Sequence, residues 1–371
     1  MSSVIAADDF TRKFHTLDGM RGVAAIAVVL RHVRFTGRWP IPGSYLAVDL
    51  FFVLSGFVLA LSNDQYLAAT TGQTWQRRMK FMFGRLVRLY PLYILGTAVG
   101  AAFLIAHNGV HMAAPAILLA ALFLPAPAQP MPLGTYRGSI FPANFPAWSL
   151  FYELVANGVY ALFARRLAVR ILLGLLTVMA ALLIFEAFKR GSLDLGSAWN
   201  TKAGGIIRVL FSFFAGVTVY KLWLSGVRAP RLPSWLLALL PFALFMIPGP
   251  RPIVDLLEVF IVFPLLVLAG ACTEPTGLLR RLMVESGEVS YPLYVLQAAF
   301  FCVAALVAPD AFGHGNGPKA PAIAAAFMVG TPCISWAAYK FYDVPVRRWV
   351  RKSFPALMPK SVLNPASPLA D

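Results

Sequence analysis

The first long apolar segment of the sequence carries an arginine and a histidine that could serve a group-transfer reaction. Arg21 and His32 are eleven residues apart, which is close to three turns of a helix. Both side chains should therefore project from one helix face, about 16 Å apart along the axis. A guanidinium can bind phosphate, and an imidazole can take a proton from a hydroxyl group. Alternatively, Arg21 reaches the membrane interface beside Asp18, and His32 bonds a neighbouring helix.

Glu153 is a second charged residue within an apolar run. The orientation derived below places it at a depth comparable to that of His32. A carboxylate beside a histidine fixes its tautomer and raises its basicity. We therefore predict Glu153 as an orienting partner of His32, with a helix–helix hydrogen bond as the alternative.

A basic segment over residues 77–91 alternates cations with aromatic and apolar residues. This pattern predicts an interfacial helix on the cytoplasmic face. Arg85 and Arg88 are three residues apart and share one side of that helix. They either contribute to a phosphate-binding mouth or anchor the helix to lipid phosphates.

Three further acidic residues lie in or near apolar segments: Asp49, Asp255 and Glu258. Asp255 and Glu258 share a helix face and could line a cavity or lie at the outer interface. The pair Ser55-Gly56, which follows Asp49, favours close packing of two helices.

The composition requires helices in a membrane to position these residues. Of the 371 residues, 59% are hydrophobic and 13% are charged, and the net charge is +16. Soluble proteins carry about a quarter charged residues, so an ordinary soluble protein and a disordered chain are excluded. The three cysteines lack metal or disulfide spacing, and we expect no metal site.

Apolar stretches long enough to cross a bilayer predict an all-α polytopic membrane protein with about ten transmembrane helices. The segment 112–125 is shorter and predicts a re-entrant or interfacial element. The predicted spans are 17–35, 45–62, 90–107, 147–164, 168–187, 204–224, 234–249, 253–272, 289–308 and 320–342.

The basic residues set the orientation. With both termini cytoplasmic, 20 of the 32 Lys and Arg residues fall in cytoplasmic segments, eight in outer segments and four within spans. This bias follows the positive-inside rule. The positive charge therefore indicates a membrane surface as partner, and no nucleic acid. We predict a cytoplasmic segment 1–16, a membrane domain 17–345 and a basic cytoplasmic tail 346–371.

Several motifs in order resemble the acyltransferase-3 family. The first is the Arg-x10-His pattern formed by Arg21 and His32. The others lie at 49–57, 85–91, 148–153, 290–294 and 343–347. Two positions depart from the family pattern: Gln297 stands where His is common, and Asp343 where Glu is common.

This resemblance implies an inner-membrane enzyme that moves an acyl group, most often acetyl, from acyl-coenzyme A to a carbohydrate. Typical acceptors in the family are cell-surface polysaccharides and lipid-linked sugars. The family's arginine and histidine, both needed for activity, match Arg21 and His32. We expect acyl-coenzyme A as a co-substrate, with no permanently bound cofactor.

Our interpretation is an O-acyltransferase in which Arg21, Arg85 and Arg88 hold the donor phosphates. His32 is the general base, and Glu153 orients it. A transporter that uses the same polar cavity is the alternative function. Direct transfer and a covalent acyl-enzyme step both fit these residues, as do a monomer and an oligomer.

Overall fold

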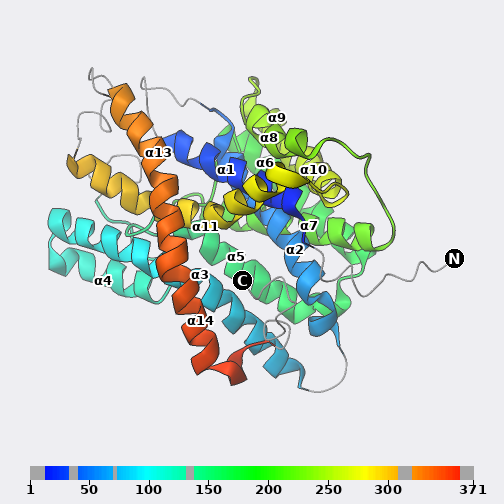
Figure 1. Cartoon of the computed structure of the whole chain (residues 1–371), viewed down its shortest axis with the longest axis horizontal. Coiled ribbons are helices and arrows are strands. Elements are labelled where there is room, and N and C mark those ends of the chain that lie inside the picture. The colour runs from blue at the N-terminus through cyan, green and yellow to red at the C-terminus, as the bar shows by residue number, and fades with distance from the viewer. Residues whose placement is uncertain (1–12, 33–40, 70–72, 131–137, 308–319, 360–371) are drawn as a thin grey trace.

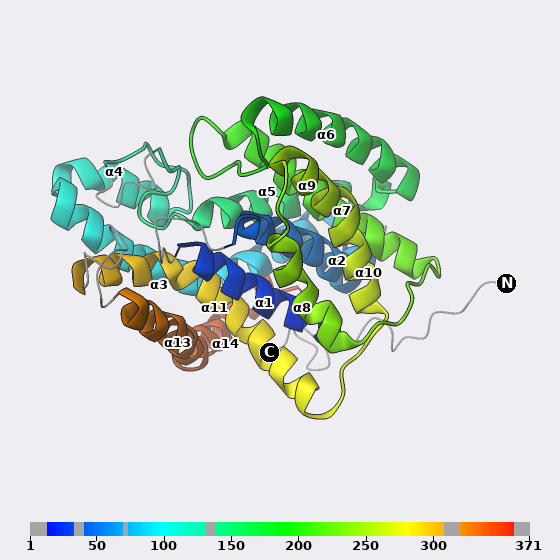
Figure 2. The ribbon, with the colours of Figure 1, turned by 90° about the horizontal axis from the view of Figure 1, so that it is seen from above.

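The structure is a computed structural model that describes residues 13–32, 41–69, 73–130, 138–307 and 320–359. Within these residues it is all-helical, apart from one isolated β-bridge between Ser139 and Ala198. Figures 1 and 2 show the helices gathered around α1 and α2. The first half of the chain forms α1 (His15–His32), η2 (Ser44–Leu46), α2 (Ala47–Ala68), α3 (Thr74–Asn108), α4 (Val110–Ala121), α5 (Ala147–Phe163) and η3 (Ala164–Arg166).

The second half of the chain contains two interruptions of regular α-helix. Wider π-helical turns follow α9 and α13, and such turns often mark functional sites. The elements are α6 (Val169–Arg190), α7 (Lys202–Leu224), α8 (Ser234–Phe245), α9 (Arg251–Leu257), η4 (Glu258–Val262), α10 (Phe263–Ala271), α11 (Gly277–Val307), α13 (Ala320–Ala338), η5 (Tyr339–Asp343), α14 (Val344–Ser353) and η6 (Pro355–Leu357).

The helices confirm a polytopic all-α membrane protein. Within the described residues, five helical stretches are long and apolar enough to cross a bilayer: Ser44–Ala68, Thr74–Asn108, Val169–Arg190, Lys202–Leu224 and Arg251–Ala271. Only 17% of the most apolar stretch of α6 is buried, so this helix presents most of its apolar surface outward. Figure 2 shows α6 at the edge of the molecule. Such a surface suits lipid.

Some predicted boundaries differ from the structure. The interfacial helix predicted at 77–91 and the span predicted at 90–107 form one continuous helix, α3, of 35 residues. Pro91 lies inside α3 without ending it. The short apolar segment predicted at 112–125 is α4, whose 12 residues span about 18 Å, less than a bilayer core.

Two helix pairs approach closely enough to require glycine. A Cβ atom on Gly56 of α2 would lie 2.0 Å from the Phe213 carbonyl oxygen of α7, and one on Gly216 would lie 2.0 Å from the Val53 carbonyl oxygen. The packing role expected for Gly56 is therefore confirmed.

The second close pair joins the two ends of the chain. A Cβ atom on Gly22 of α1 would lie 2.5 Å from Ser286 of α11, and one on Gly19 would lie 2.8 Å from Met283. Going from the Gly19 contact to the Gly22 contact, the residue number rises in both helices, so α1 and α11 run parallel. They lie side by side in both views (Figures 1 and 2).

Candidate functional site

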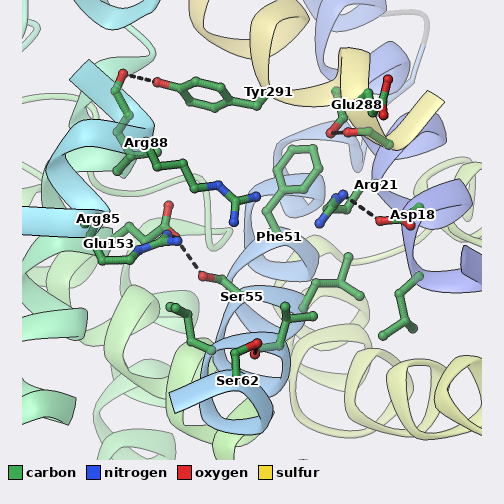
Figure 3. Close-up of a pocket in the computed structure, with 18 of the residues that line it drawn as sticks. Asp18, Arg21, Phe51, Ser55, Ser62, Arg85, Arg88, Glu153, Glu288 and Tyr291 are labelled. Atoms are coloured by element: carbon green, nitrogen blue, oxygen red, sulfur yellow. Dashed lines mark hydrogen bonds and ion pairs between the residues drawn. The ribbon is translucent and has the colours of Figure 1, made fainter. Parts of the chain in front are cut away.

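A cavity of about 340 Å³ lies among α1, α2, α3, α5, α11 and the α13–α14 junction. Figure 3 shows charged side chains converging on it from several helices. Apolar residues of α2, such as Phe51 and Leu54, form much of the remaining wall. The cations that line it are Lys13, Arg21, Arg85, Arg88, Arg347 and Arg351, and the acidic residues are Asp18, Glu153, Glu288 and Asp343.

Two of these arginines are held by an acidic residue of their own helix. The Arg21 guanidinium donates to Asp18 at 2.6 Å, and Arg347 lies 2.8 Å from Asp343. Both pairs lie one helical turn apart in sequence, so each helix fixes its own arginine. The Arg347 and Asp343 side chains are buried, at 10% and 2% exposure.

Arg85 is held across helices. Its guanidinium of α3 donates to Glu153 Oε1 of α5 at 2.6 Å, and the hydroxyl of Ser55 on α2 donates to the same oxygen at 2.7 Å. The Arg85 and Glu153 side chains are only 9% and 13% exposed. The two hydrogen bonds join α2, α3 and α5 at the cavity wall.

Arg88 differs from these three arginines. Within the described part of the chain it forms no hydrogen bond and no ion pair. Its side chain extends into the cavity from α3, toward Phe51 and Arg21 (Figure 3). A half-buried guanidinium without a carboxylate is costly unless an anion binds it, so Arg88 is suited to hold a phosphate.

The structure brings four of the five predicted site residues together. Arg21, Arg85, Arg88 and Glu153 line one cavity, but His32 does not. The prediction that Glu153 lies beside His32 differs from this arrangement, because its carboxylate contacts Arg85 and Ser55. A carboxylate at this depth forms its strongest hydrogen bonds with a guanidinium.

His32 lies at the other end of α1, where its ring packs against those of Phe145 and Phe301 at centroid distances of 5.0 and 5.4 Å. Its Nδ1 is 2.8 Å from the Val28 carbonyl oxygen. A carbonyl can only accept, so Nδ1 carries the proton and Nε2 of the neutral ring is a base. The main chain thus orients His32 as Glu153 was expected to.

Along the axis of α11, the last residue that lines the cavity lies close to the level of His32. This residue, Tyr294, shares a 2.6 Å hydrogen bond with Ser149. Because α1 and α11 run parallel with Gly19 opposite Met283, Tyr294 lies about 3 Å short of the level of His32. Of α1, only residues up to Arg21 line the cavity, so His32 lies beyond its wall, near the level of Tyr294.

A buried ion pair outside the cavity supports this arrangement. Arg208 of α7 and Asp49 of α2 are both fully buried, and the guanidinium binds both carboxylate oxygens. Arg208 also donates to the carbonyl oxygens of Tyr45 and Leu195. The sequence analysis noted Asp49 as an acidic residue in or near an apolar segment, but its pairing with Arg208 depends on the close approach of α2 and α7.

The other two acidic residues noted in the sequence have different surroundings. Asp255 accepts hydrogen bonds from Arg251, Tyr45 and the Leu193 amide, so it joins three segments. Glu258 lies in the π-helical turn after α9, 2% exposed. Among the described residues, neither of its carboxyl oxygens has a hydrogen-bond partner.

Comparison with known proteins agrees with this geometry. Residues 14–340 match a family described as an acyltransferase domain. The exopolysaccharide production protein ExoZ of Rhizobium meliloti is 27% identical over 312 residues, covering 81% of this chain and 89% of that protein. No solved structure matches the chain.

Two other relatives match over shorter lengths. Protein 2 in the picA locus of Rhizobium radiobacter is 40% identical over 191 residues, 47% of this chain and 95% of that protein. The peptidoglycan O-acetyltransferase OatA of Listeria monocytogenes is 34% identical over 76 residues, 19% of this chain and 12% of that protein. Because the family match spans most of the chain and the helices form a membrane fold around a charged cavity, the chain belongs to the acyltransferase-3 family of membrane enzymes.

Proposed function

We propose that this enzyme transfers an acyl group, most simply acetyl, from acyl-coenzyme A to a hydroxyl group of a cell-surface or lipid-linked carbohydrate. The names of two relatives support this acceptor class, since one is an exopolysaccharide production protein and the other is a peptidoglycan O-acetyltransferase. The donor binds in the cavity, and His32 acts at its far end.

The observation that carries the proposal is the guanidinium of Arg88, which extends into the cavity without an ion pair among the described residues. Coenzyme A carries several phosphate groups on one end and a long pantetheine arm on the other. Arg88 binds a phosphate, and Arg21 and Arg85 supply further positive charge beside it. The arm then extends past Phe51 toward Ser149 and Tyr294.

In the transfer step, Nε2 of His32 removes the proton from the acceptor hydroxyl. The oxygen attacks the thioester carbonyl carbon, the carbon–sulfur bond breaks, and the thiolate of coenzyme A takes up the proton from the imidazolium. A positioned base contributes about 10²–10⁴-fold to such a rate. Glu153 has a positioning role for Arg85 in place of the expected role at His32.

The orientation follows from the basic residues. We propose ten crossings in the inner membrane, a cytoplasmic segment 1–16, a membrane domain 17–345 and a cytoplasmic tail 346–371. The cavity then opens to the cytoplasm, where acyl-coenzyme A is made, and His32 lies toward the outer leaflet. In this arrangement α14 of the tail supplies Arg347 and Arg351 to the cavity mouth.

The test is a transfer assay with membranes that contain the enzyme and acetyl-coenzyme A labelled in its acetyl group. We expect alkali-labile label on carbohydrate with the wild-type enzyme and none with His32→Ala. If the protein were a transporter, no carbohydrate would become labelled. Transfer by His32→Ala at the wild-type rate would disprove the role of His32.

A further inference from the structure

A cluster of buried polar atoms without partners lies beside His32 and outside the donor cavity. Within the described part of the chain, Oε1 of Gln297, Oγ1 of Thr331 and Oδ1 of Asn144 have no hydrogen-bond partner. These residues are 1%, 3% and 1% exposed. Each such atom costs about 1–3 kcal/mol in a folded protein, so a cluster of them indicates a ligand or water.

Gln297 and Thr331 meet where α13 crosses α11 (Figure 1). The rings of Phe301 and Phe327 are in contact there, with centroids 5.0 Å apart. The helices run in opposite senses, because Glu288 and Tyr339 both line the cavity further along. Gln297 lies one turn before Phe301 in α11, and Thr331 lies one turn after Phe327 in α13. Because the two helices are antiparallel, Gln297 and Thr331 lie at the same level.

Asn144 approaches α11 at nearly the same level, from the side of α3. A Cβ atom on Gly96 of α3 would lie 3.1 Å from both the Asn144 amide nitrogen and the Val295 carbonyl oxygen. The Asn144 amide is therefore close to the turn of α11 that carries Gln297. Its nitrogen donates to α3, at the Thr97 hydroxyl, which leaves the oxygen as an acceptor.

The histidine ring is part of the same neighbourhood. Phe145, the residue after Asn144, and Phe301, one turn beyond Gln297, are the two rings that pack against His32. Two amide oxygens and one hydroxyl therefore belong to residues that are adjacent to, or one helical turn from, Phe145, Phe301 and Phe327, and the first two of these rings contact the base. Amide oxygens accept hydrogen bonds from hydroxyl groups, and aromatic rings cover the apolar faces of a ligand.

We propose that Gln297, Asn144 and Thr331 form the acceptor subsite, in which they bind hydroxyl groups of the carbohydrate next to the one that His32 deprotonates. This inference rests on the proposed transferase function. Gln297 contributes the central contact, because its amide nitrogen is held by the Tyr294 carbonyl oxygen at 2.8 Å. That hydrogen bond fixes the amide, while Oε1 has no hydrogen-bond partner among the described residues.

The experiment measures transfer of the labelled acetyl group from acetyl-coenzyme A to a polysaccharide by the purified enzyme. The polysaccharide comes from the surface of the cells that produce the enzyme, and mild alkali first removes its existing esters. Gln297→Leu and Thr331→Val should each raise the KM for polysaccharide about three- to tenfold. The KM for acetyl-coenzyme A should stay at the wild-type value. Gln297→Glu, which keeps an oxygen at this position, should restore a KM nearer to the wild-type value.

Thr218→Val is the matched control. Thr218 is also a buried threonine, but its hydroxyl donates to the Phe214 carbonyl oxygen of its own helix, and this variant should keep both KM values. If Gln297→Leu and Thr331→Val leave the KM for polysaccharide unchanged, the subsite is refuted. If Gln297→Leu does not fold, Thr331→Val decides alone. Absence of transfer by the wild-type enzyme refutes the transferase function itself.

Discussion

Removing Arg85 should weaken donor binding more than removing Arg88, although both are arginines of the same cavity. Arg88→Ala removes one charged hydrogen bond to a phosphate, worth about 1.5–3 kcal/mol. This corresponds to a rise in Kd of about 10- to 150-fold. Arg85→Ala removes a similar contact and also leaves the Glu153 carboxylate, which Arg85 binds at 2.6 Å, without its cation.

The extra cost comes from repulsion between that carboxylate and the donor phosphate. Two like charges about 5 Å apart at an effective dielectric constant of about 20 repel by about 3 kcal/mol. The Kd for coenzyme A should therefore be about 100-fold higher for Arg85→Ala than for Arg88→Ala. Adding Glu153→Gln to Arg85→Ala should remove most of this excess, because a neutral amide replaces the unpaired charge.

The assay is equilibrium binding of labelled coenzyme A to the detergent-purified enzyme, repeated at several salt concentrations. Arg348→Ala is the matched control, since Arg348 is an exposed arginine of α14 that does not line the cavity. If Arg85→Ala and Arg88→Ala have equal effects, or if Glu153→Gln restores nothing, the assignment of these residues to the donor site is refuted.

Three more outcomes follow from the structure. His32→Ala should abolish acyl transfer while coenzyme A binds with unchanged Kd, and a parallel loss of binding would place His32 in the donor site instead. Asp49→Leu leaves the Arg208 charge fully buried and unpaired, so it should lower stability by about 3–5 kcal/mol. Thermal unfolding followed by size-exclusion chromatography measures this, and an unchanged midpoint would contradict it. Gly56→Ala should prevent the close approach of α2 to Phe213 and should reduce the yield of monodisperse protein far more than Gly174→Ala, because no atom lies within 4 Å of a Cβ at Gly174.

The arginines that line the cavity could be predicted from sequence because their signals are local. Arg85 and Arg88 are one turn apart on a basic segment, and an arginine in an apolar segment, such as Arg21, is rare enough to indicate function. The prediction did not require knowledge of which helices pack together. The motif order was sufficient to place Arg21 and the two arginines of α3 in one family pattern.

The pairing of charges could not be predicted in the same way. The depth of Glu153 was inferred from the ends of an apolar run, and such boundaries are uncertain by two to four residues, or about 3–6 Å along a helix. That error is about the rise of one helical turn, so it is large enough to misplace Glu153 by one turn relative to His32. Likewise, Arg208 binds Asp49 because Gly56 and Gly216 allow close contact between α2 and α7, a consequence of tertiary packing alone.

The parallel contact between α1 and α11 has a consequence for biogenesis. Asp18 and Arg21 belong to α1, while Met283, Ser286 and Gly287, which pack against α1, belong to a helix that begins at Gly277. A ribosome has therefore synthesised three quarters of the protein before the cavity can close around its arginines. Until then α1 needs a temporary neighbour for its two charges, such as the insertion machinery or lipid headgroups. An incomplete chain that escapes into the membrane lacks the cavity wall formed by Gly287, Glu288 and Tyr291.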